Sequence, residues 1–522
     1  TPKAAAIAVK DGIITAVSQD KPAADWCESN AGAGAQTVDL GGKTLLPGFT
    51  DSHGHLLGIG LREMMVNMTG TLSVPELQER LKAAVADTPD GDTIHGRGWI
   101  ETHWPEKRFP NKGDLDAIAP NNPVILGRAD GHAAVVNTAA LTAAGITSET
   151  PAPFGGDILK DENGEPTGML IDNAMSLVDS LIPVLTDERR RAGYAKASDV
   201  YTSRGWTNIH AMSVNINNLP LMQELTADDK IALKVYASPD IKSTEQLKQL
   251  LDFTPNATGR VRARAIKLYS DGALGSRGAA LLAPYSDDPG YTGLLLITEE
   301  TIMPILEEAL RSGIQVNTHA IGDRANQLLL NWYEAAFAAV PEDARAIADP
   351  RWRVEHAQIL APNDLGRFQA LGIIPSMQPS HAIGDLHFAV DRLGKKRLAG
   401  GYAWRSLIDS GTIIAGGSDA PVEVGDPRIE FYAAVTRQDL KGYSDENWYP
   451  NEKVTRQEAL KMFTIWPAYA AFEEDVTGSI EPGKAADFTV FGTDIMTSDP
   501  QDILSAKVAM TIVNGKAVYR AD

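Results

Sequence analysis

Short apolar segments that alternate with amphipathic helix patterns run through most of this 522-residue chain. Several helix patterns, such as those at 302–312, 324–339 and 404–410, stand directly before an apolar segment. Helices and strands in alternation predict a parallel sheet, and eight such units predict an α/β fold of the (β/α)8 TIM barrel type. We expect the eight strands near 46–52, 206–211, 232–237, 264–270, 314–319, 352–357, 372–377 and 412–418.

The two ends of the chain have a different pattern. Residues 1–48 and 473–522 contain short alternating strands separated by turn signals such as Asn514-Gly515. Short strands cannot bury their apolar faces alone, so we expect both ends to pair into one small β-sandwich domain. The barrel would then occupy residues 49–472.

An unusually long segment separates the first two barrel strands. Its length of about 150 residues exceeds that of an ordinary connection, which predicts an inserted subdomain at about 70–180. The insert has strand patterns of its own at 93–98 and 123–128 and a helix pattern at 74–86.

Composition narrows the classes of partner. The formal net charge of -20 argues against a nucleic-acid partner, and the chain has no run of about 18 apolar residues that would predict a membrane span. Cys27 is the single cysteine, so no intramolecular disulfide can form. The sequence begins at Thr1 close to a strand pattern, so we expect a missing N-terminal segment, such as a cleaved signal peptide. A cytoplasmic and a secreted location both stay open.

Two histidines close the first predicted strand. His53 and His55 follow an apolar run and lie one residue apart. Because alternate side chains of a strand share a face, both imidazoles would point to one place, which suits a metal ion. Alone, such a pair is more often two surface histidines.

Four other predicted strands also have residues that can bind metals, one within the fourth strand and the others at strand ends. Barrels of this type hold their chemistry at the carboxyl ends of the strands. Taken singly, each residue has a structural explanation, such as a core hydrogen bond or a helix cap. Together they predict one metal centre. The residues are Lys267, His319, His356 and Asp419.

The motifs around these residues resemble the amidohydrolase superfamily, and specifically its family-3 branch of YtcJ-like and N-substituted formamide deformylase-like metal-dependent hydrolases. The resemblance covers nearly the whole chain. It is carried by residues 46–55, 267–279, 317–324, 353–356, 417–421 and 478–487, and in the insert by 96–99, 130–133 and 137–141.

The resemblance implies a ligand set and a cofactor. One or two divalent ions are expected, with Zn2+ the expected metal, and Lys267 is in a position that is carboxylated in many members of the superfamily. A carbamate is an anion that can bridge two cations, whereas an ammonium beside them is disfavoured. The implied ligands are His53, His55, Lys267, His319, His356 and Asp419.

The implied reaction is hydrolysis of a carbon–nitrogen bond, most simply a linear amide or N-acyl bond, in a small molecule. A divalent ion lowers the pKa of bound water towards about 7, and Asp419 is placed to accept the proton and pass it to the leaving amine. His132 or His210 would stabilise the oxyanion. A loop is expected after the seventh strand, at 381–396, where it would shape the pocket, and His381 would line that pocket. Trp99 would form an apolar wall, although a place in the core of the insert explains it equally well.

Other functions stay open at this stage. A mononuclear deaminase or cyclic-amide hydrolase on the same barrel uses a similar histidine set without needing Lys267, and would hold about one metal ion per chain rather than two. A noncatalytic scaffold is a further alternative, against which all six ligand-type residues argue. Base rates favour a homodimer, although the sequence identifies no interface.

Overall fold

The structure is a computed structural model that describes residues 4–20, 25–153, 156–182 and 184–521. The chain divides into two compact units. The first consists of Thr1–Leu56, Ala197–Ala420 and Val424–Asp522, and the second of Leu57–Lys196 with Pro421–Glu423. The insert expected at about 70–180 falls within the residue range of the second unit.

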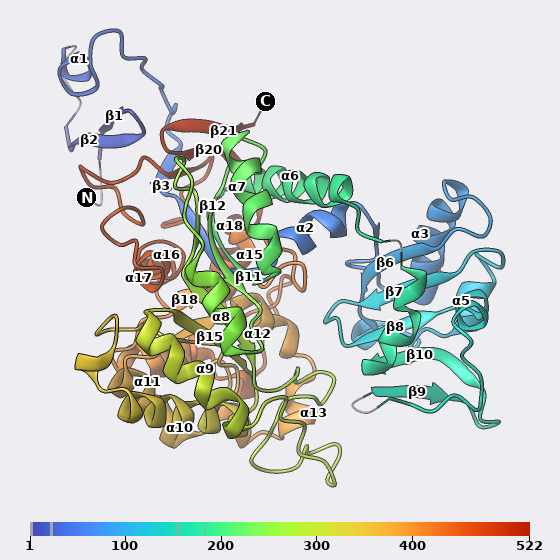
Figure 1. Cartoon of the computed structure of the whole chain (residues 1–522). Coiled ribbons are helices and arrows are strands. Elements are labelled where there is room, and N and C mark those ends of the chain that lie inside the picture. The colour runs from blue at the N-terminus through green and yellow to red at the C-terminus, as the bar shows by residue number, and fades with distance from the viewer. Residues whose placement is uncertain (1–3, 21–24, 154–155, 183, 522) are drawn as a thin grey trace. The chain divides into compact units, whose positions relative to one another are not determined.

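Two parallel sheets of the first unit contain all eight predicted strands (Figure 1). Their strand orders are β13-β12-β11-β4 and β14-β15-β16-β17-β18. The fourth predicted strand is divided into β13 and β14 at Arg264. The strands are β4 (Phe49–Gly54), β11 (Trp206–Val214), β12 (Lys234–Pro239), β13 (Val261–Ala263), β14 (Ala265–Tyr269), β15 (Gln315–Ala320), β16 (Arg353–His356), β17 (Ile374–Met377) and β18 (Ala415–Gly416).

Backbone contacts join the two parallel sheets near the carboxyl ends of their strands. Asp240, just after β12, forms a parallel bridge with Lys267 of β14. The N–H of Asp419, beyond β18, donates to the carbonyl oxygen of His53 on β4 at 2.6 Å. The strand ends that carry the predicted ligands therefore lie together.

Helices precede the strands as predicted. In α9, Ile302, Leu306 and Leu310 are buried at helical spacing, and Gly313 ends the helix in the left-handed conformation that glycine adopts without strain. The segment 381–396, expected as a loop, is instead mostly helical. None of the helices that the structure describes is both long and apolar enough to cross a bilayer. The helices between the parallel strands and after β18 are α6 (Asp187–Arg204), α7 (Leu219–Ala227), α8 (Thr244–Leu251), α9 (Glu299–Ser312), α10 (Asp323–Ala339), α11 (Leu365–Leu371), α12 (Pro379–Asp385), α13 (Ala389–Leu393), α14 (Trp404–Asp409), α15 (Pro427–Thr436), α16 (Arg456–Met462) and α17 (Ile465–Ala470).

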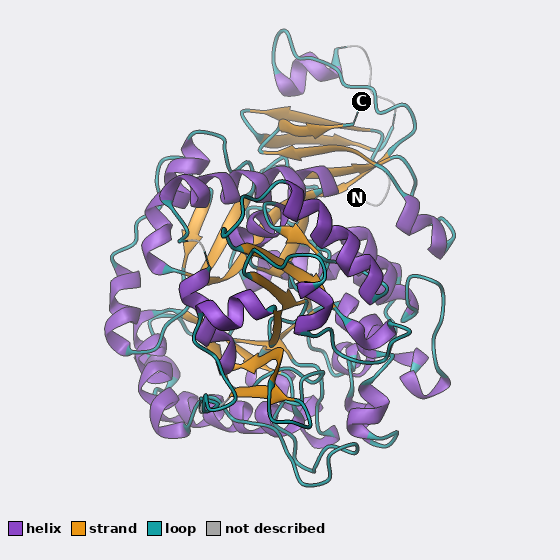
Figure 2. Cartoon of the chain, turned by 90° about the vertical axis from the view of Figure 1, so that its right-hand side faces the viewer, coloured by secondary structure: helices purple, strands orange, loops and turns teal. Residues whose placement is uncertain are grey.

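Strands from both ends of the chain share one antiparallel sheet of order β21-β20-β19-β3, seen near both termini in Figure 2. β1 and β2 form a separate antiparallel pair. Ile14 packs with Ala486 and Phe488, so the pair contacts the C-terminal segment. A two-layer sandwich of these sheets stays a prediction. The elements are β1 (Ala6–Lys10), β2 (Ile13–Ser18), α1 (Trp26–Ala31), β3 (Thr44–Pro47), β19 (Phe488–Phe491), α18 (Pro500–Ser505), β20 (Val508–Val513) and β21 (Lys516–Arg520).

The second unit is built around a mixed sheet of order β5-β6-β7-β8-β10-β9. Leu77 and Leu81 of α3 pack with Leu126 and Val135 of the sheet in a buried cluster. The predicted helix and both predicted strands of the insert are present. The elements are α2 (Leu56–Glu63), β5 (Val66–Asn67), α3 (Val74–Ala86), β6 (Ile94–Trp99), α4 (Lys112–Asp116), β7 (Val124–Arg128), β8 (Ala133–Val136), α5 (Thr138–Ala143), β9 (Gly156–Lys160) and β10 (Pro166–Asp172).

Candidate metal centre

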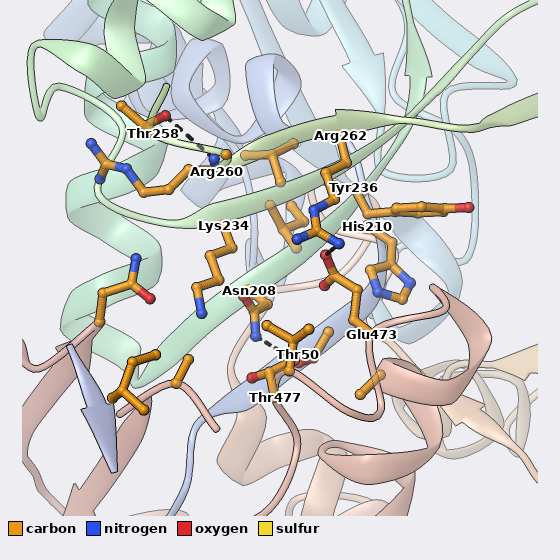
Figure 3. Close-up of a pocket in the computed structure, with 18 residues that line it drawn as sticks. Thr50, Asn208, His210, Lys234, Tyr236, Thr258, Arg260, Arg262, Glu473 and Thr477 are labelled. Carbon is orange, nitrogen blue, oxygen red and sulfur yellow. Dashed lines mark hydrogen bonds and ion pairs between the residues drawn. The ribbon is translucent and has the colours of Figure 1, made fainter. Parts of the chain in front are cut away.

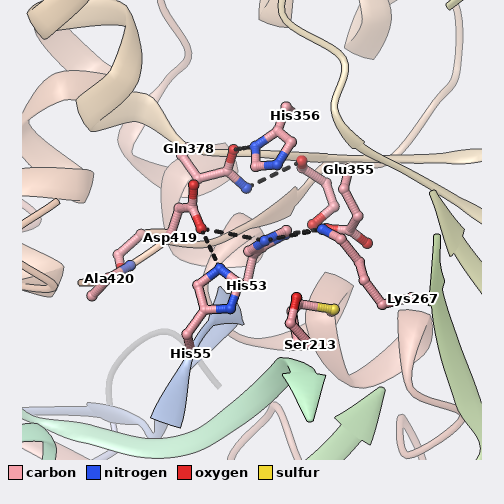
Figure 4. A network of polar contacts seen from close by, with 12 residues as sticks. His53, His55, Ser213, Lys267, Glu355, His356, Gln378, Asp419 and Ala420 are labelled. Atoms are coloured by element: carbon pink, nitrogen blue, oxygen red, sulfur yellow. Dashed lines mark hydrogen bonds and ion pairs between the residues drawn. The ribbon is translucent and has the colours of Figure 1, made fainter. Parts of the chain in front are cut away.

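The two histidines of the first strand meet the aspartate that follows the last strand (Figure 4). The Nε2 atom of His55 lies 2.9 Å from Oδ1 of Asp419, and Nε2 of His53 lies 3.3 Å from the same oxygen. His53 is fully buried, whereas His55 is partly exposed. Residues 364 positions apart in the sequence thus converge on one point.

Lys267 and His356 complete the buried side of this cluster. Nζ of Lys267 lies 3.4 Å from Nε2 of His53, and the ring centroids of His53 and His356 are 4.7 Å apart. One ligand atom each from His53, His356 and Asp419 lies within 4.8 Å of the others. Imidazole nitrogens and a carboxylate oxygen are donors that Zn2+ accepts, so the donor set fits a divalent ion.

The backbone is strained where two of these side chains are presented. His356 has a φ of 74° and Asp419 a φ of 58°, both in the left-handed region that non-glycine residues rarely adopt. Such conformations cost roughly 1–3 kcal/mol and persist at functional sites where the surrounding structure enforces them. Both residues stand where a parallel strand ends.

His319 lies next to His356, with 4.6 Å between the ring centroids. Its Nε2 is 3.5 Å from Oδ1 of Asp271. Asp271 is buried and accepts hydrogen bonds from the N–H groups of Ile321 and Gly322, which fixes the turn after β15. Burial raises the pKa of Asp271 to about 7 against the lowering effect of these hydrogen bonds.

A buried ion pair that the sequence did not reveal orients His53. Nδ1 of His53 lies 2.5 Å from Oε2 of Glu355, and the other carboxylate oxygen is 2.8 Å from Nε of Arg353. Arg353 also donates to Oγ of Ser376 at 2.7 Å. Because Glu355 holds Nδ1, the Nε2 atom of His53 faces Asp419.

Gln378 orients the imidazole of His356 as Glu355 orients that of His53. Its Oε1 lies 2.8 Å from Nδ1 of His356, which leaves Nε2 for the centre. Neither Glu355 nor Gln378 was expected from the sequence. The signal for Glu355 was a charged residue inside a buried strand, since such a residue is normally paired.

Hydrogen bonds of Asp51, on β4, connect this strand to the segment that follows β18. Its carboxylate accepts hydrogen bonds from the Oγ of Ser418 at 2.6 Å and from the hydroxyl of Tyr201 at 2.8 Å. Burial raises the pKa of Asp51 to about 6, although the hydrogen bonds from Ser418 oppose the shift.

The electrostatics favour neutral imidazoles at His53 and His356 and an ionised carboxylate at Asp419. Burial, followed by the charge of Lys267, holds the pKa of His53 well below its ordinary value. Burial and the neighbouring His53 lower the pKa of His356 in the same way. Burial alone would raise the pKa of Asp419, but His53 and His55 hold it well below its ordinary value. These are the ionisation states in which such side chains bind metals.

Of the expected substrate contacts, His381 lies against the cluster. Its Nε2 is 3.5 Å from Oδ2 of Asp419, and its Nδ1 is 2.9 Å from Nε2 of Gln358. His381 Nε2 forms no hydrogen bond within the described residues.

The predicted end of the second strand, at residue 211, is wrong, so His210 does not stand at the end of that strand. β11 continues to Val214, and Nδ1 of His210 lies 2.9 Å from Nη1 of Arg353. His210 lines a cavity of about 190 Å³ together with Lys234, at the amino end of β12, and Arg262 of β13 (Figure 3). The sequence misplaced His210 because the strand extends beyond the apolar run.

Two expected contacts belong to the second unit. Nδ1 of His132 lies 2.7 Å from Oδ1 of Asp172. Trp99 is fully buried in the core of that unit, and its indole N–H donates to the carbonyl oxygen of Leu126 at 2.7 Å. These contacts favour a structural role for Trp99.

Comparison with known proteins extends the likeness over the whole chain. Residues 36–519 match the sequence model of the Amidohydrolase family. The chain is 32% identical over 519 residues to YtcJ of Bacillus subtilis, covering 98% of this chain and 96% of that protein. It is 28% identical over 502 residues to N-substituted formamide deformylase of Arthrobacter pascens, covering 93% and 90%.

A solved structure shares the architecture. The crystal structure of an uncharacterized metal-dependent hydrolase from Pyrococcus horikoshii superposes with a TM-score of 0.74 at 28% sequence identity, covering 94% of this chain and 93% of that one. With the match to the family model, this likeness confirms the resemblance inferred from the motifs. The chain belongs to the amidohydrolase family, whose members are metal-dependent hydrolases acting on carbon–nitrogen bonds.

Proposed function

We propose that this enzyme cleaves a linear amide or N-acyl bond of a small molecule, with Asp419 as the general base. The proposed ligands of one or two divalent ions, with Zn2+ expected, are His53, His55, Lys267, His319, His356 and Asp419. The observation that carries the proposal is the convergence of His53 and His55 on Oδ1 of Asp419, at 3.3 and 2.9 Å. The match to a deformylase supports a linear amide as the substrate.

The protein's own groups would divide the work as follows. A divalent cation bound here supplies Lewis acidity and lowers the pKa of water. Oδ1 of Asp419 faces the two imidazoles, so Oδ2 is the atom that accepts the proton and later delivers it to the leaving nitrogen. His381, 3.5 Å from Oδ2, keeps that oxygen oriented and borders the substrate. We retain His132 as a candidate contact to the substrate and assign His210 to the support of Arg353.

The proposal also includes carboxylation of Lys267 and closure of the two parallel sheets into one barrel. Carboxylation of Lys267 would replace an ammonium 3.4 Å from His53 by an anion able to bridge two cations. Burial lowers the pKa of Lys267, although Glu355 opposes the shift, and the neutral amine is the form that reacts with CO2. We also propose that the two parallel sheets form one (β/α)8 barrel, because contacts join them at β12 and β14 and at β4 and β18.

The test combines metal analysis with hydrolysis. Protein purified without chelators is analysed for Zn, Mn and Fe, and amine release is measured with N-benzylformamide and N-butylformamide. The proposal predicts about two ions per chain, release of both amines, and loss of activity on chelation that added metal restores. One ion with ammonia release from aminated heterocycles would instead support the deaminase alternative, and absence of metal after reconstitution would overturn the proposal.

A further inference from the structure

Three side chains outside the proposed ligand set form a polar cluster at neighbouring strand ends. Tyr269 ends β14, Asp240 follows β12 and Ser213 lies near the end of β11. The hydroxyl of Tyr269 donates to Oδ1 of Asp240 at 3.0 Å, and Ser213 Oγ is hydrogen-bonded to the same hydroxyl. We call these three residues the rim cluster.

The rim cluster borders the candidate metal centre. Tyr269 and Lys267 are two residues apart on β14 and so share one face of the sheet. Nζ of Lys267 lies 5.2 Å from the centroid of the Tyr269 ring, and the Tyr269 and His319 rings are 5.9 Å apart. Tyr269 is nevertheless 37% exposed, so a molecule held at the metal centre can reach it.

A β-bulge aims Ser213 at this cluster. Met212 pairs with Ser238 and Val214 with Pro239, so Ser213 has no partner in the β11–β12 register. Its φ of 55° lies in the left-handed region. Met212 faces Asn317, and strict alternation would turn Ser213 to the opposite face. The bulge instead returns Ser213 to the face of Tyr269, and bulges commonly re-aim side chains beside active sites.

The hydrogen bonds leave the rim cluster able to accept hydrogen bonds from a ligand. Tyr269 donates to Asp240, and the hydroxyl of Ser213 contacts both Tyr269 and Asp240, so lone pairs of the Asp240 carboxylate remain to accept hydrogen bonds. Asp240 is partly buried, and the charges that act on it come from Lys267 and His55 of the proposed ligand set, neither of which forms an ion pair with it among the described residues. A partly buried carboxylate without a direct ion-pair partner can bind a cationic ligand, all the more where carboxylation removes the charge of Lys267.

We propose that the rim cluster selects substrates that carry a protonated amine a few bonds from the scissile amide, with Asp240 as the counter-ion and Tyr269 and Ser213 holding its orientation. This inference rests on the proposed function, since it assigns a substrate class to the same centre. The alternative to this proposal is that Asp240 only balances the charge of Lys267 and does not contact the substrate.

The experiment compares matched substrates that differ in one charge. N-(4-aminobutyl)formamide and N-pentylformamide have the same length, and shorter and longer homologues test the spacing. We expect wild-type kcat/KM to be at least 10-fold higher for the ammonium substrate. Asp240→Asn should bring the ratio of the two kcat/KM values close to 1, and Tyr269→Phe should reduce it about threefold. Asp252→Asn, at an exposed helix end, is the control that should leave the ratio unchanged.

A binding measurement keeps the inference separate from the proposed function. Calorimetry with 1,4-diaminobutane should give an affinity at least 10-fold weaker for Asp240→Asn than for the wild type and Asp252→Asn. If no formamide is hydrolysed, the proposed function fails and this affinity alone decides the inference. A ratio near 1 in the wild type, or an equal loss of kcat on both substrates in Asp240→Asn, would overturn it. If Asp240→Asn does not fold, Tyr269→Phe tests the inference instead. An unchanged substrate ratio and an unchanged diamine affinity in Tyr269→Phe would then overturn it.

Discussion

The Nδ1 atom of His53 lies 2.5 Å from Oε2 of Glu355, and both side chains are fully buried. Glu355 in turn lies 2.8 Å from Arg353, so the carboxylate is held between a cation and an imidazole. Groups that hold the second nitrogen of a ligating histidine fix its tautomer and orientation. Glu355 therefore determines how His53 presents Nε2 to the proposed metal.

Replacing Glu355 by Gln should weaken metal binding. The amide keeps the size of the side chain but removes the charge that faces Arg353 and His53, and loss of such a partner typically costs about 10- to 100-fold in metal affinity. Competition with a chromogenic chelator measures the affinity. Asp364→Asn, which removes a buried carboxylate paired with Arg367 on α11, should lower stability and leave metal affinity unchanged. Equal affinities for Glu355→Gln and wild type would contradict this role of Glu355.

Replacing Asp419 by Asn should abolish turnover while metal is retained. General bases contribute about 10²- to 10⁴-fold to rate, and an amide oxygen can still serve as a ligand without accepting the proton. Turnover and metal content are measured on the same preparation. Asp426→Asn keeps an N-cap side chain at α15 but removes the charge paired with Arg428, and should lower the Tm without changing kcat. Loss of both metal and turnover would make Asp419 an essential ligand rather than the base.

The strand positions were predictable because they depend on local apolar patterns. The convergence of the six ligand-type residues was predictable from a general rule for parallel strands. Apolar runs located each strand, and parallel strands bring their carboxyl ends to one edge. His53 and Asp419, at the ends of the first and last strands, could be placed together by this rule alone. The hydrogen bond from the N–H of Asp419 to the carbonyl oxygen of His53 shows that the two residues do lie together.

Features that depend on tertiary contacts were not predictable. Glu355 pairs with a residue 302 positions away, so no local spacing reports it. His210 was misplaced because the bulge at Ser213 lets β11 continue beyond its apolar run. The segment after β17 was expected as a loop, yet Pro379 starts α12, since proline is tolerated in the first turn of a helix.

Gly417→Ala should disturb both the parallel strands and the proposed metal centre. An added Cβ would lie 2.6 Å from the backbone nitrogen of His53 and 3.0 Å from Oδ1 of Asp51, closer than real contacts. Overpacking of this kind costs about 1–3 kcal/mol, so the Tm and metal content should both fall. Gly366→Ala in α11 meets nothing within 4 Å and should leave both unchanged or raise the Tm. An unaltered Tm in Gly417→Ala would contradict the close packing of β18 against β4.

Acid should weaken the contact between α14 and α16. Nη1 and Nη2 of Arg405 each lie 2.8 Å from an oxygen of Glu458, and this pairing lowers the pKa of Glu458 to about 2. A carboxyl whose pKa is lower in the folded state stabilises the fold above its ordinary pKa of 4.5 and loses that effect as pH falls towards 2. Because the Glu458 side chain is 20% exposed, solvent screening limits the contribution to about 1 kcal/mol.

Glu458→Gln isolates this ionic contribution. Gln can still accept the capping hydrogen bond from the N–H of Thr455, so the helix start is preserved while the charge is lost. The difference in Tm between wild type and Glu458→Gln should be largest near pH 7 and shrink below pH 4.5, whereas Glu300→Gln, on an exposed first turn of α9, should show a smaller difference. A double variant with Arg405→Met should add little to Glu458→Gln, since the two residues act as one pair. A Tm difference that stays constant from pH 7 to pH 3 would show that the effect of Glu458 comes from capping rather than from its charge.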